Sequence, residues 1–295
     1  MSKKILSTIL LLLSKLPFWI LYRISDVLFV LVYYIFGYRK KVVYKNLYNS
    51  FPEKSEKEIK KIAKDFYRYL PDIIVETIKM RSISQEEVLK RMTLINAEDN
   101  VYRHLNNGKS IIGVTAHYAN WELGIHRLSL VTNDPILIIY KPLNNKDFDD
   151  IFNHIRSRFG ANMVPMKQIL RHIVKLKGQP HISIFVADQT PLYQDSDYFM
   201  PFLNQEALVY TGTERIAKMT GNPVVFCEIR RKTKRGYYEC EFRTLIEDPS
   251  QYEQYEITQI CNRYTEEVIK KDPQFWLWSH NRWKRKRREK YETNS

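Results

Sequence analysis

The stretch Thr115-Ala116-His117-Tyr118-Ala119-Asn120-Trp121-Glu122-Leu123-Gly124 follows directly on the apolar run Ile111-Ile112-Gly113-Val114. The run is short, rich in β-branched residues and bounded by polar ones, which predicts a buried strand, and the residues from Trp121 onward predict a helix. We therefore expect His117 in a strand-to-helix turn and Asn120 as the helix N-cap. Glu122 then falls in the first helical turn, where the helix dipole favours an anion.

This arrangement lets His117 and Glu122 meet, whereas two residues five apart within one helix would lie about 140° apart around its axis. A carboxylate that holds one imidazole nitrogen leaves the other free to take a proton from an alcohol. The pattern is weak on its own, because a chain with 7 His and 33 acidic residues contains one His-x4-Asp/Glu about once by chance. The alternative to a catalytic role is that His117 is a buried structural histidine with a hydrogen-bond partner, next to a Glu at a helix start.

The chain after residue 93 alternates short apolar runs with helical patterns, which predicts an α/β fold whose sheet is layered with helices. Two capping boxes, Ser55-x-x-Glu58 and Ser84-x-x-Glu87, predict the starts of a long helix to about residue 80 and of a short one. Arg235-Gly236 predicts a hairpin tip between residues 224–231 and 237–245. The other expected strands cover residues 111–114, 135–140 and 181–187, and the other helices cover 121–130, 147–159, 167–175, 211–219 and 252–271.

The N-terminal residues 5–37 are nearly all apolar, in three uncharged runs that each fall short of the ~18 to 20 residues of a clean membrane span. Pro17 favours a break, and Arg23 and Asp26 stand one turn apart and can pair. Three interpretations stay open: one imperfect span from about residue 16 to 37, a bent helical pair in the membrane interface, or a buried core helix. A signal peptide is not expected, because no small-x-small cleavage site follows the first run.

Basic residues dominate the charge balance of the chain. The formal net charge of +14 predicts an acidic partner surface, which can be anionic lipid, nucleic acid or an acidic carrier protein. Basic residues at 38–41 and 45 would hold the following domain on the cytoplasmic side of a membrane. Three cysteines without CxxC or Cys/His spacing make a disulfide framework or zinc site unexpected, which fits a reducing compartment.

The chain ends in an aromatic run, residues 275–283, followed by the basic residues 284–288. Tryptophans and arginines in this density can stack bases and bind phosphates, as nucleic-acid-binding proteins do. Tryptophans at a membrane interface with arginines reaching lipid phosphates explain the run as well. A solvated tail over residues 284–290 is the third interpretation.

Polar residues also stand where predicted strands end. Tyr140 and Lys141 follow one strand, and Asp188 and Gln189 follow another, and ligand sites in α/β sheets favour the carboxyl ends of strands. Arg156 falls near a helix C-terminus, where it can also simply compensate the dipole. A plain loop and a turn Asp are the alternatives for the other positions. The apolar residues 199–203 suit the lining of a lipid-chain pocket and equally suit plain core.

Taken together, these motifs resemble the lipid A biosynthesis acyltransferases, the late secondary enzymes of the lauroyl/myristoyl type. The ordered motifs are His117-Tyr118-Ala119-Asn120-Trp121-Glu122, Tyr140-Lys141-Pro142, Arg156, Ala187-Asp188-Gln189, residues 199–203 before Thr211-Gly212, and residues 278–284. The resemblance covers nearly the whole chain. Glu122 favours this family, because glycerolipid acyltransferases typically carry Asp there. Lys141 and Asn281 depart from the arginines common in the family, and a lysine lacks arginine's bidentate fork.

The resemblance implies a single mixed sheet layered with helices, like that of the glycerolipid acyltransferases, behind an N-terminal apolar helical membrane anchor. It divides the chain into an anchoring segment (residues 1–43), an acyltransferase domain (residues 44–283) and a basic tail (residues 284–295). It further implies transfer of a fatty acyl chain from an acyl carrier protein or coenzyme A thioester to a hydroxyl of a lipid A precursor. The site would lie at the cytoplasmic face of the bacterial inner membrane, on an anionic membrane surface, without metal, cofactor or nucleic acid.

The resemblance also implies roles for individual residues. His117 would be a general base with Glu122 fixing its tautomer, and no covalent enzyme intermediate would be needed. Oxyanion donors would be backbone N–H groups near Asn120 or the side chain of Arg156. The remaining supporting or substrate-binding residues would be Tyr140, Lys141, Asp188, Gln189 and Arg282. The alternatives are an acyltransferase of the same fold acting on a glycerolipid or aminolipid, and a membrane-anchored nucleic-acid-binding module.

Overall fold

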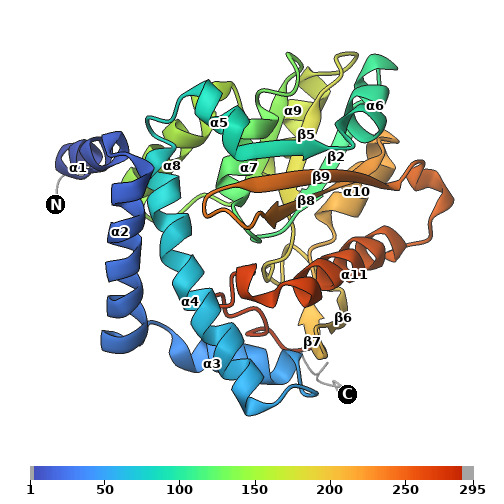
Figure 1. Ribbon diagram of the computed structural model, residues 1–295. Coiled ribbons are helices and arrows are strands. Elements are labelled where there is room, and N and C mark those ends of the chain that lie inside the picture. The colour runs from blue at the N-terminus through green and yellow to red at the C-terminus, as the bar shows by residue number, and fades with distance from the viewer. Residues whose placement is uncertain (1–2, 288–295) are drawn as a thin grey trace.

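A mixed seven-stranded sheet forms the centre of the computed structural model, which describes residues 3–287 (Figure 1). The strand order is β1-β9-β8-β2-β5-β3-β4, and every neighbouring pair is parallel except the β8–β9 hairpin. The strands are β1 (Met92–Ile95), β2 (Ile111–Thr115), β3 (Ile136–Tyr140), β4 (Asn162–Pro165), β5 (Ile182–Val186), β8 (Val224–Arg231) and β9 (Tyr238–Ile246). The central strands are buried on both faces because helices flank the sheet, which confirms the predicted α/β class.

The helices of the domain follow the predicted pattern closely. Ser55 and Glu58 form the predicted capping box at the start of α4 (Glu56–Lys79), and Ser84 caps α5 (Gln85–Arg91). The other predicted helices are α7 (Trp121–Leu128), α8 (Lys146–Arg156), α9 (Ile169–Lys175), α10 (Gly212–Thr220) and α11 (Glu256–Lys271), whereas α3 (Lys40–Ser50) and α6 (Arg103–Asn106) were not predicted. Short π-helical and 3-10 turns join several of them: η2 (Glu98–Tyr102), η3 (Ser157–Phe159), η4 (Met166–Gln168), η5 (Pro249–Gln251) and η6 (Pro273–Phe275).

Four strands were not predicted, and each is only four residues long. Edge strands β1 and β4 pair with one neighbour each, so their sequences carry neither a long apolar run nor a clear alternation. Residues 199–203 form β6 (Phe199–Phe202) and the start of a turn to β7 (Gln205–Leu208). The turn residues Leu203 and Asn204 both have positive φ, 48° and 58°, as a two-residue hairpin turn requires, but leucine gives no sequence signal for that conformation.

The N-terminal apolar segment folds into two helices that break at Pro17, α1 (Lys3–Lys15) and α2 (Phe18–Phe29). The second continues into the π-helical turns of η1 (Val30–Ile35) and runs alongside α4 (Figure 1). Among the described residues, Phe18–Ile35 is long and apolar enough to cross a membrane. The expected boundary between residues 43 and 44 lies inside α3, whose Asn46 donates hydrogen bonds to the carbonyls of Trp278 and His280, both at 2.9 Å.

The C-terminal tryptophans are core residues, which corrects the expectation that they stack bases or lie at a membrane interface. Trp276, Trp278 and Trp283 are 2%, 0% and 7% exposed. The indole of Trp278 donates to the carbonyl of Pro273 at 2.6 Å, so its one polar atom is satisfied inside the protein. Of the basic tail, residues 284–287 are described, and the remainder of the expected solvated stretch lies outside the described residues.

Gly113 in the middle of β2 allows the neighbouring strands to pack closely. A Cβ atom at this position would lie 2.1 Å from Cδ1 of Ile184 on β5. We therefore expect Gly113→Ala to lower the free energy of unfolding by about 1–3 kcal/mol through overpacking. Denaturant titration measures this loss.

The variant Ile184→Val provides the control for Gly113→Ala, because it removes the colliding methyl group at a cost of about 0.5–1.5 kcal/mol by itself. The double variant should therefore be more stable than the sum of the two losses predicts. Strictly additive losses would show that the contact with Ile184 does not cause the destabilisation.

Candidate active site

His117 lies in the turn between β2 and α7, as predicted. A segment close to the C-terminus holds this turn: the N–H of Leu277 donates to the carbonyl of His117 at 3.1 Å, and the N–H of Ala119 donates to the carbonyl of Phe275 at 3.0 Å. Ala119 has a φ of 48°, so the chain turns sharply before Asn120. Asn120 caps α7 as predicted, because its Oδ1 accepts the N–H of Leu123 at 2.8 Å.

Asp188 is the carboxylate that holds the imidazole of His117. Its Oδ1 lies 2.7 Å from Nδ1 of His117, and its Oδ2 accepts the indole N–H of Trp276 at 2.7 Å. The sheet explains how His117 and Asp188 meet, although 71 positions separate them in the chain. β2 and β5 are parallel with Thr115 paired to Val186, and each of the two side chains comes two residues after its member of that pair. Parallel strands present their carboxyl ends at one edge, where the two side chains converge.

Glu122 does not hold the histidine, which corrects the prediction from their spacing. Its carboxylate accepts two hydrogen bonds from Arg156, one from Nη2 and one from Nε at 2.8 Å, and a third from the indole of Trp121 at 3.2 Å. Arg156 comes from the last turn of α8. At this helix C-terminus, Arg156 therefore does more than compensate the helix dipole, because it also forms the ion pair with Glu122.

Both site carboxylates are charged despite their burial. Asp188 and Glu122 are 3% and 6% exposed, and burial alone would raise the pKa of each. For Asp188, the charge and hydrogen bond of His117 and the hydrogen bond of Trp276 outweigh burial, so the pKa lies below its ordinary value. For Glu122, the charge and hydrogen bonds of Arg156 have the same effect on its pKa.

His117, Glu122 and Arg156 border a cavity of about 670 Å³. Three other predicted site residues also border it: Tyr140, Lys141 and Gln189. Most of the remaining wall is apolar and comes from α1, α4, α7, α8 and the ends of β3 and β5, including Leu6, Leu10, Ile74, Ile78, Phe148, Phe152, Ile155 and Phe185. A cavity of this size with an apolar wall and a few convergent polar groups suits a long alkyl chain with a reactive group at one place.

The ring nitrogen of His117 that faces away from Asp188 is free to contact a bound molecule. Among residues 3–287, Nε2 of His117 has no hydrogen-bond partner, and the side chain is 22% exposed. Because the carboxylate of Asp188 accepts the proton on Nδ1, the lone pair of the neutral ring is on Nε2. The arrangement therefore presents a base to a group bound in the cavity.

Arg282 is buried in the core and does not border the cavity, which corrects its prediction as a substrate-binding residue. Its side chain is 0% exposed, donates to the carbonyl of Leu208 at 2.7 Å and lies over the ring of Phe202 at 5.2 Å. Burial lowers its pKa to about 10. Residues 199–203 likewise do not border the cavity: Met200, Phe202 and Leu203 are core residues, Phe199 is half-buried and Pro201 is exposed.

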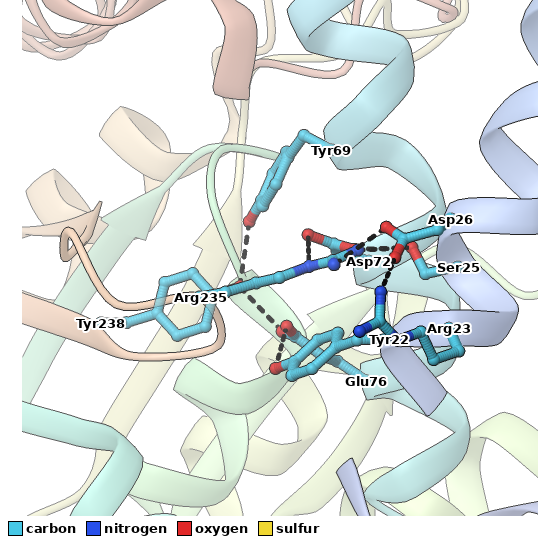
Figure 2. Close-up of polar contacts among 9 residues, drawn as sticks. All are labelled: Tyr22, Arg23, Ser25, Asp26, Tyr69, Asp72, Glu76, Arg235 and Tyr238. Carbon is cyan, nitrogen blue, oxygen red and sulfur yellow. Dashed lines mark hydrogen bonds and ion pairs between the residues drawn. The ribbon is translucent and has the colours of Figure 1, made fainter. Parts of the chain in front are cut away.

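Glu76 on α4 belongs to the support of the site, although no sequence motif contains it. Its carboxylate is 4% exposed and accepts hydrogen bonds from Tyr22 at 2.9 Å, from Tyr238 at 2.7 Å and from Nδ2 of Asn120 at 2.5 Å (Figure 2 shows the two tyrosines). It thereby fixes the residue that caps α7, three positions after His117. A charged residue on the buried side of an amphipathic helix is the sequence signal that marks it.

A family model described as bacterial lipid A biosynthesis acyltransferase matches residues 4–285. The chain is 24% identical to the lipid A biosynthesis lauroyltransferase of Escherichia coli K12 over 278 residues, which are 94% of this chain and 89% of that protein. It is 25% identical to the palmitoleoyltransferase of the same organism over 83% of this chain and 79% of the relative. It is also 24% identical to a lipid A biosynthesis acyltransferase of Haemophilus influenzae over 85% and 79%.

The buried carboxyl of Glu76 makes stability depend on pH. Burial, assisted by the charge of Asp72, raises its pKa from 4.5 to about 7, so the folded protein binds this proton more tightly than the unfolded chain. The contribution of Glu76 to the free energy of unfolding therefore falls as the pH rises from about 4.5 to about 7, on the order of 3 kcal/mol in total.

The variant Glu76→Gln tests this dependence. Its amide oxygen can accept from Asn120 and Tyr238, and its amide nitrogen can donate to the hydroxyl of Tyr22, so every hydrogen bond keeps a partner. Melting temperatures of the wild type and the variant should be compared from about pH 5 to pH 8. We expect the melting temperature of the variant to rise relative to that of the wild type as the pH increases. A constant difference between the two melting temperatures over this range would contradict the raised pKa of Glu76.

Proposed function

The chain belongs to the bacterial lipid A biosynthesis acyltransferase family, and from this premise we propose that His117 and Asp188 form its catalytic pair. The reaction is transfer of a fatty acyl group from a thioester to a hydroxyl of a lipid A precursor. The observation that carries the proposal is the 2.7 Å hydrogen bond between Nδ1 of His117 and Asp188, which leaves Nε2 basic at the wall of an apolar cavity.

The chemistry of the pair is general-base catalysis without an acyl-enzyme. Nε2 of His117 takes the proton of the acceptor hydroxyl as its oxygen attacks the thioester carbonyl. The new C–O bond forms, the C–S bond breaks, and the imidazolium returns the proton to the departing thiolate. Asp188 stabilises the imidazolium electrostatically and keeps the ring in the correct tautomer, the role of a buried Asp beside a catalytic histidine in other acyl-transfer enzymes.

Arg156 is the donor that we assign to the oxyanion of the tetrahedral intermediate. The N–H of Leu123 at the start of α7 is already used by Asn120, so this helix end has one donor fewer to offer. Arg156 borders the cavity and gives Nε and Nη2 to Glu122, which leaves N–H groups of its five to face a substrate. Glu122 is then a positioning residue that holds the guanidinium in place.

We also propose the identity of the acyl donor and the side of the membrane on which the site lies. The family is membrane-associated, and we propose a site at the cytoplasmic face of the bacterial inner membrane, where acyl carrier protein supplies the thioester. The formal net charge of +14 supports both an acidic carrier protein and an anionic phosphoglycolipid acceptor. Lys141 at the cavity edge supports phosphate binding, as a point charge without arginine's fork. The nucleic-acid alternative loses base stacking by the three C-terminal tryptophans, because they are buried.

The first test of this proposal removes each member of the catalytic pair. His117→Ala should lower kcat by about 10²- to 10⁴-fold, the range for a positioned general base. Asp188→Asn keeps an acceptor for Nδ1 but removes the charge, so it should also lose activity while the histidine remains. Both are measured by acyl transfer from acyl carrier protein thioester to detergent-dispersed lipid A precursor.

The matched control for the catalytic pair is His154→Ala, which removes an exposed histidine of α8. Its activity and melting temperature should match the wild type. If His117→Ala retained wild-type kcat with an unchanged melting curve, the mechanism would be wrong.

The second test separates the roles of Glu122 and Arg156. Glu122→Gln should lower kcat by ~10-fold or more, because the guanidinium loses the charge that holds it. Arg156→Met should cost at least as much, and the double variant should be no worse than Arg156→Met alone, since the carboxylate acts through the arginine. Arg158→Met is the control, because Arg158 bonds the carbonyls of Met80 and Ile83 and does not border the cavity. Fully additive losses would mean that Glu122 acts independently of Arg156.

A further inference from the structure

Two faces of the apolar N-terminal helix have opposite environments. The outer face of α2, η1 and the residues after them is exposed and almost wholly apolar, with Trp19, Val27, Val30, Tyr34, Ile35 and Phe36 between 46% and 73% exposed. Arg23 and Asp26 are the charged residues on this face, and they pair with each other at 3.7 Å. The inner face packs on α4 and buries Leu21, Ser25 and Phe29.

The inner face is also bound to the domain by polar contacts along its length. The hydroxyl of Ser25 donates to Asp72 at 2.6 Å, and the hydroxyl of Tyr22 donates to Glu76 at 2.9 Å (Figure 2). Arg235, from the tip of the β8–β9 hairpin, reaches across to Asp26 at 2.9 Å. Helix α2 is thus fixed to two separate elements of the domain.

Arg235 is shared between α2 and α4. Its Nε donates to Oδ2 of Asp72 at 2.9 Å and its Nη2 to the hydroxyl of Ser25 at 3.2 Å. Asp72 is 3% exposed, so its charge depends on these partners. The adjacent Gly236, at φ 76°, lets the hairpin approach so closely that a Cβ would lie 1.7 Å from the hydroxyl of Tyr22.

These contacts are incompatible with a crossing of the bilayer by residues 18–35. If α2 left α4 to cross alone, the buried carboxylates Asp72 and Glu76 would each lose a hydrogen-bond partner, and Arg235 would lose its contacts with α2. If α4 crossed with it, the stretch of α4 that lies beside α2 and η1 would carry the charged residues Arg68, Asp72, Glu76 and Lys79 into the hydrocarbon. The helix therefore has to meet the membrane from the side, while it stays on the domain.

Helix α1 contributes a second surface of the same kind. Its Ile5, Ile9 and Leu12 are 54%, 42% and 61% exposed, while Leu6 and Leu10 border the cavity that contains His117. The helix is held in place at its end, where Lys79 donates to the carbonyls of Ser14 and Leu16, each at 2.9 Å. One apolar face of α1 thus closes the cavity and the other is open to the surroundings.

We propose that α1 and α2 lie together in a single leaflet of an anionic bilayer and that neither crosses it. The exposed apolar faces enter the acyl-chain region, and the exposed cations around them, Lys4, Lys15, Arg23 and Lys41, contact lipid phosphates. Helix α1, whose Leu6 and Leu10 border the cavity, then lies between the cavity and the leaflet. This topology does not depend on the proposed chemistry, so its tests use no activity measurement.

The first experiment compares the two ends of the segment in sealed membranes. Full-length proteins carrying Lys4→Cys or Lys57→Cys, both at exposed positions, are treated with a membrane-impermeant maleimide in inside-out and in right-side-out vesicles. The three native cysteines are buried and give little background. We expect both positions to be labelled in the same vesicle preparation and both to be protected in the other. Labelling of the two positions in opposite preparations would show a crossing and overturn the proposal.

The second experiment measures depth at the centre of the apolar stretch. Val27, 60% exposed, is replaced by Trp in a Trp19→Phe background, and the fluorescence of the Trp19→Phe parent is subtracted. Vesicles of phosphatidylethanolamine and phosphatidylglycerol carry bromine either close to the headgroup or at the end of the acyl chain. We expect stronger quenching by the shallow bromines. Stronger quenching by the deep bromines would place residue 27 at the bilayer centre and refute a one-leaflet position, and the absence of any quenching would refute membrane contact by this face.

Discussion

The hydrogen-bonded carboxylate of Asp188 connects the parts of the molecule that make up the site. Asp188 itself follows the end of β5. Its carboxylate accepts hydrogen bonds from the imidazole of His117, after the end of β2, and from the indole of Trp276 in the C-terminal segment. A buried carboxylate is stable only with such donors, because burial by itself opposes its charge. The C-terminal residues 275–277, which hydrogen-bond to the turn that contains His117, thus build the site together with the sheet.

The same rule organises a second group of buried acids between the N-terminal helices and the domain. Asp72 and Glu76 lie on α4, and Figure 2 shows their partners from α2 and from the β8–β9 hairpin. A further partner of Glu76, Asn120, comes from the start of α7. Glu76 is therefore hydrogen-bonded both to the helix that we place in the leaflet and to Asn120, the N-cap of α7. Buried acids with complete sets of donors fix relative positions more narrowly than apolar contacts do, since each bond requires a defined direction.

The sequence predicts local features well and distant pairings poorly. The capping boxes, the central strands and the N-cap Asn120 follow from patterns a few residues long, and the structure has all of them. The partner of His117 does not follow, because spacing favoured the nearby Glu122, whereas the sheet brings Asp188 from another strand. Nor does composition reveal that the C-terminal tryptophans are buried, since burial depends on which elements cover them. Short edge strands and the Leu203-Asn204 turn have no pattern long enough to detect.

The pairing of Thr115 with Val186 restricts how relatives of this protein can diverge. His117 and Asp188 each follow that pair by two residues, so inserting or deleting one residue at either strand end would turn one side chain to the opposite face of the sheet. Length changes are compatible with the catalytic pair only outside these short segments, for example before β2 or well beyond Gln189. Homologues that perform the same reaction should therefore vary in length in the connecting loops and keep both of these two-residue intervals constant.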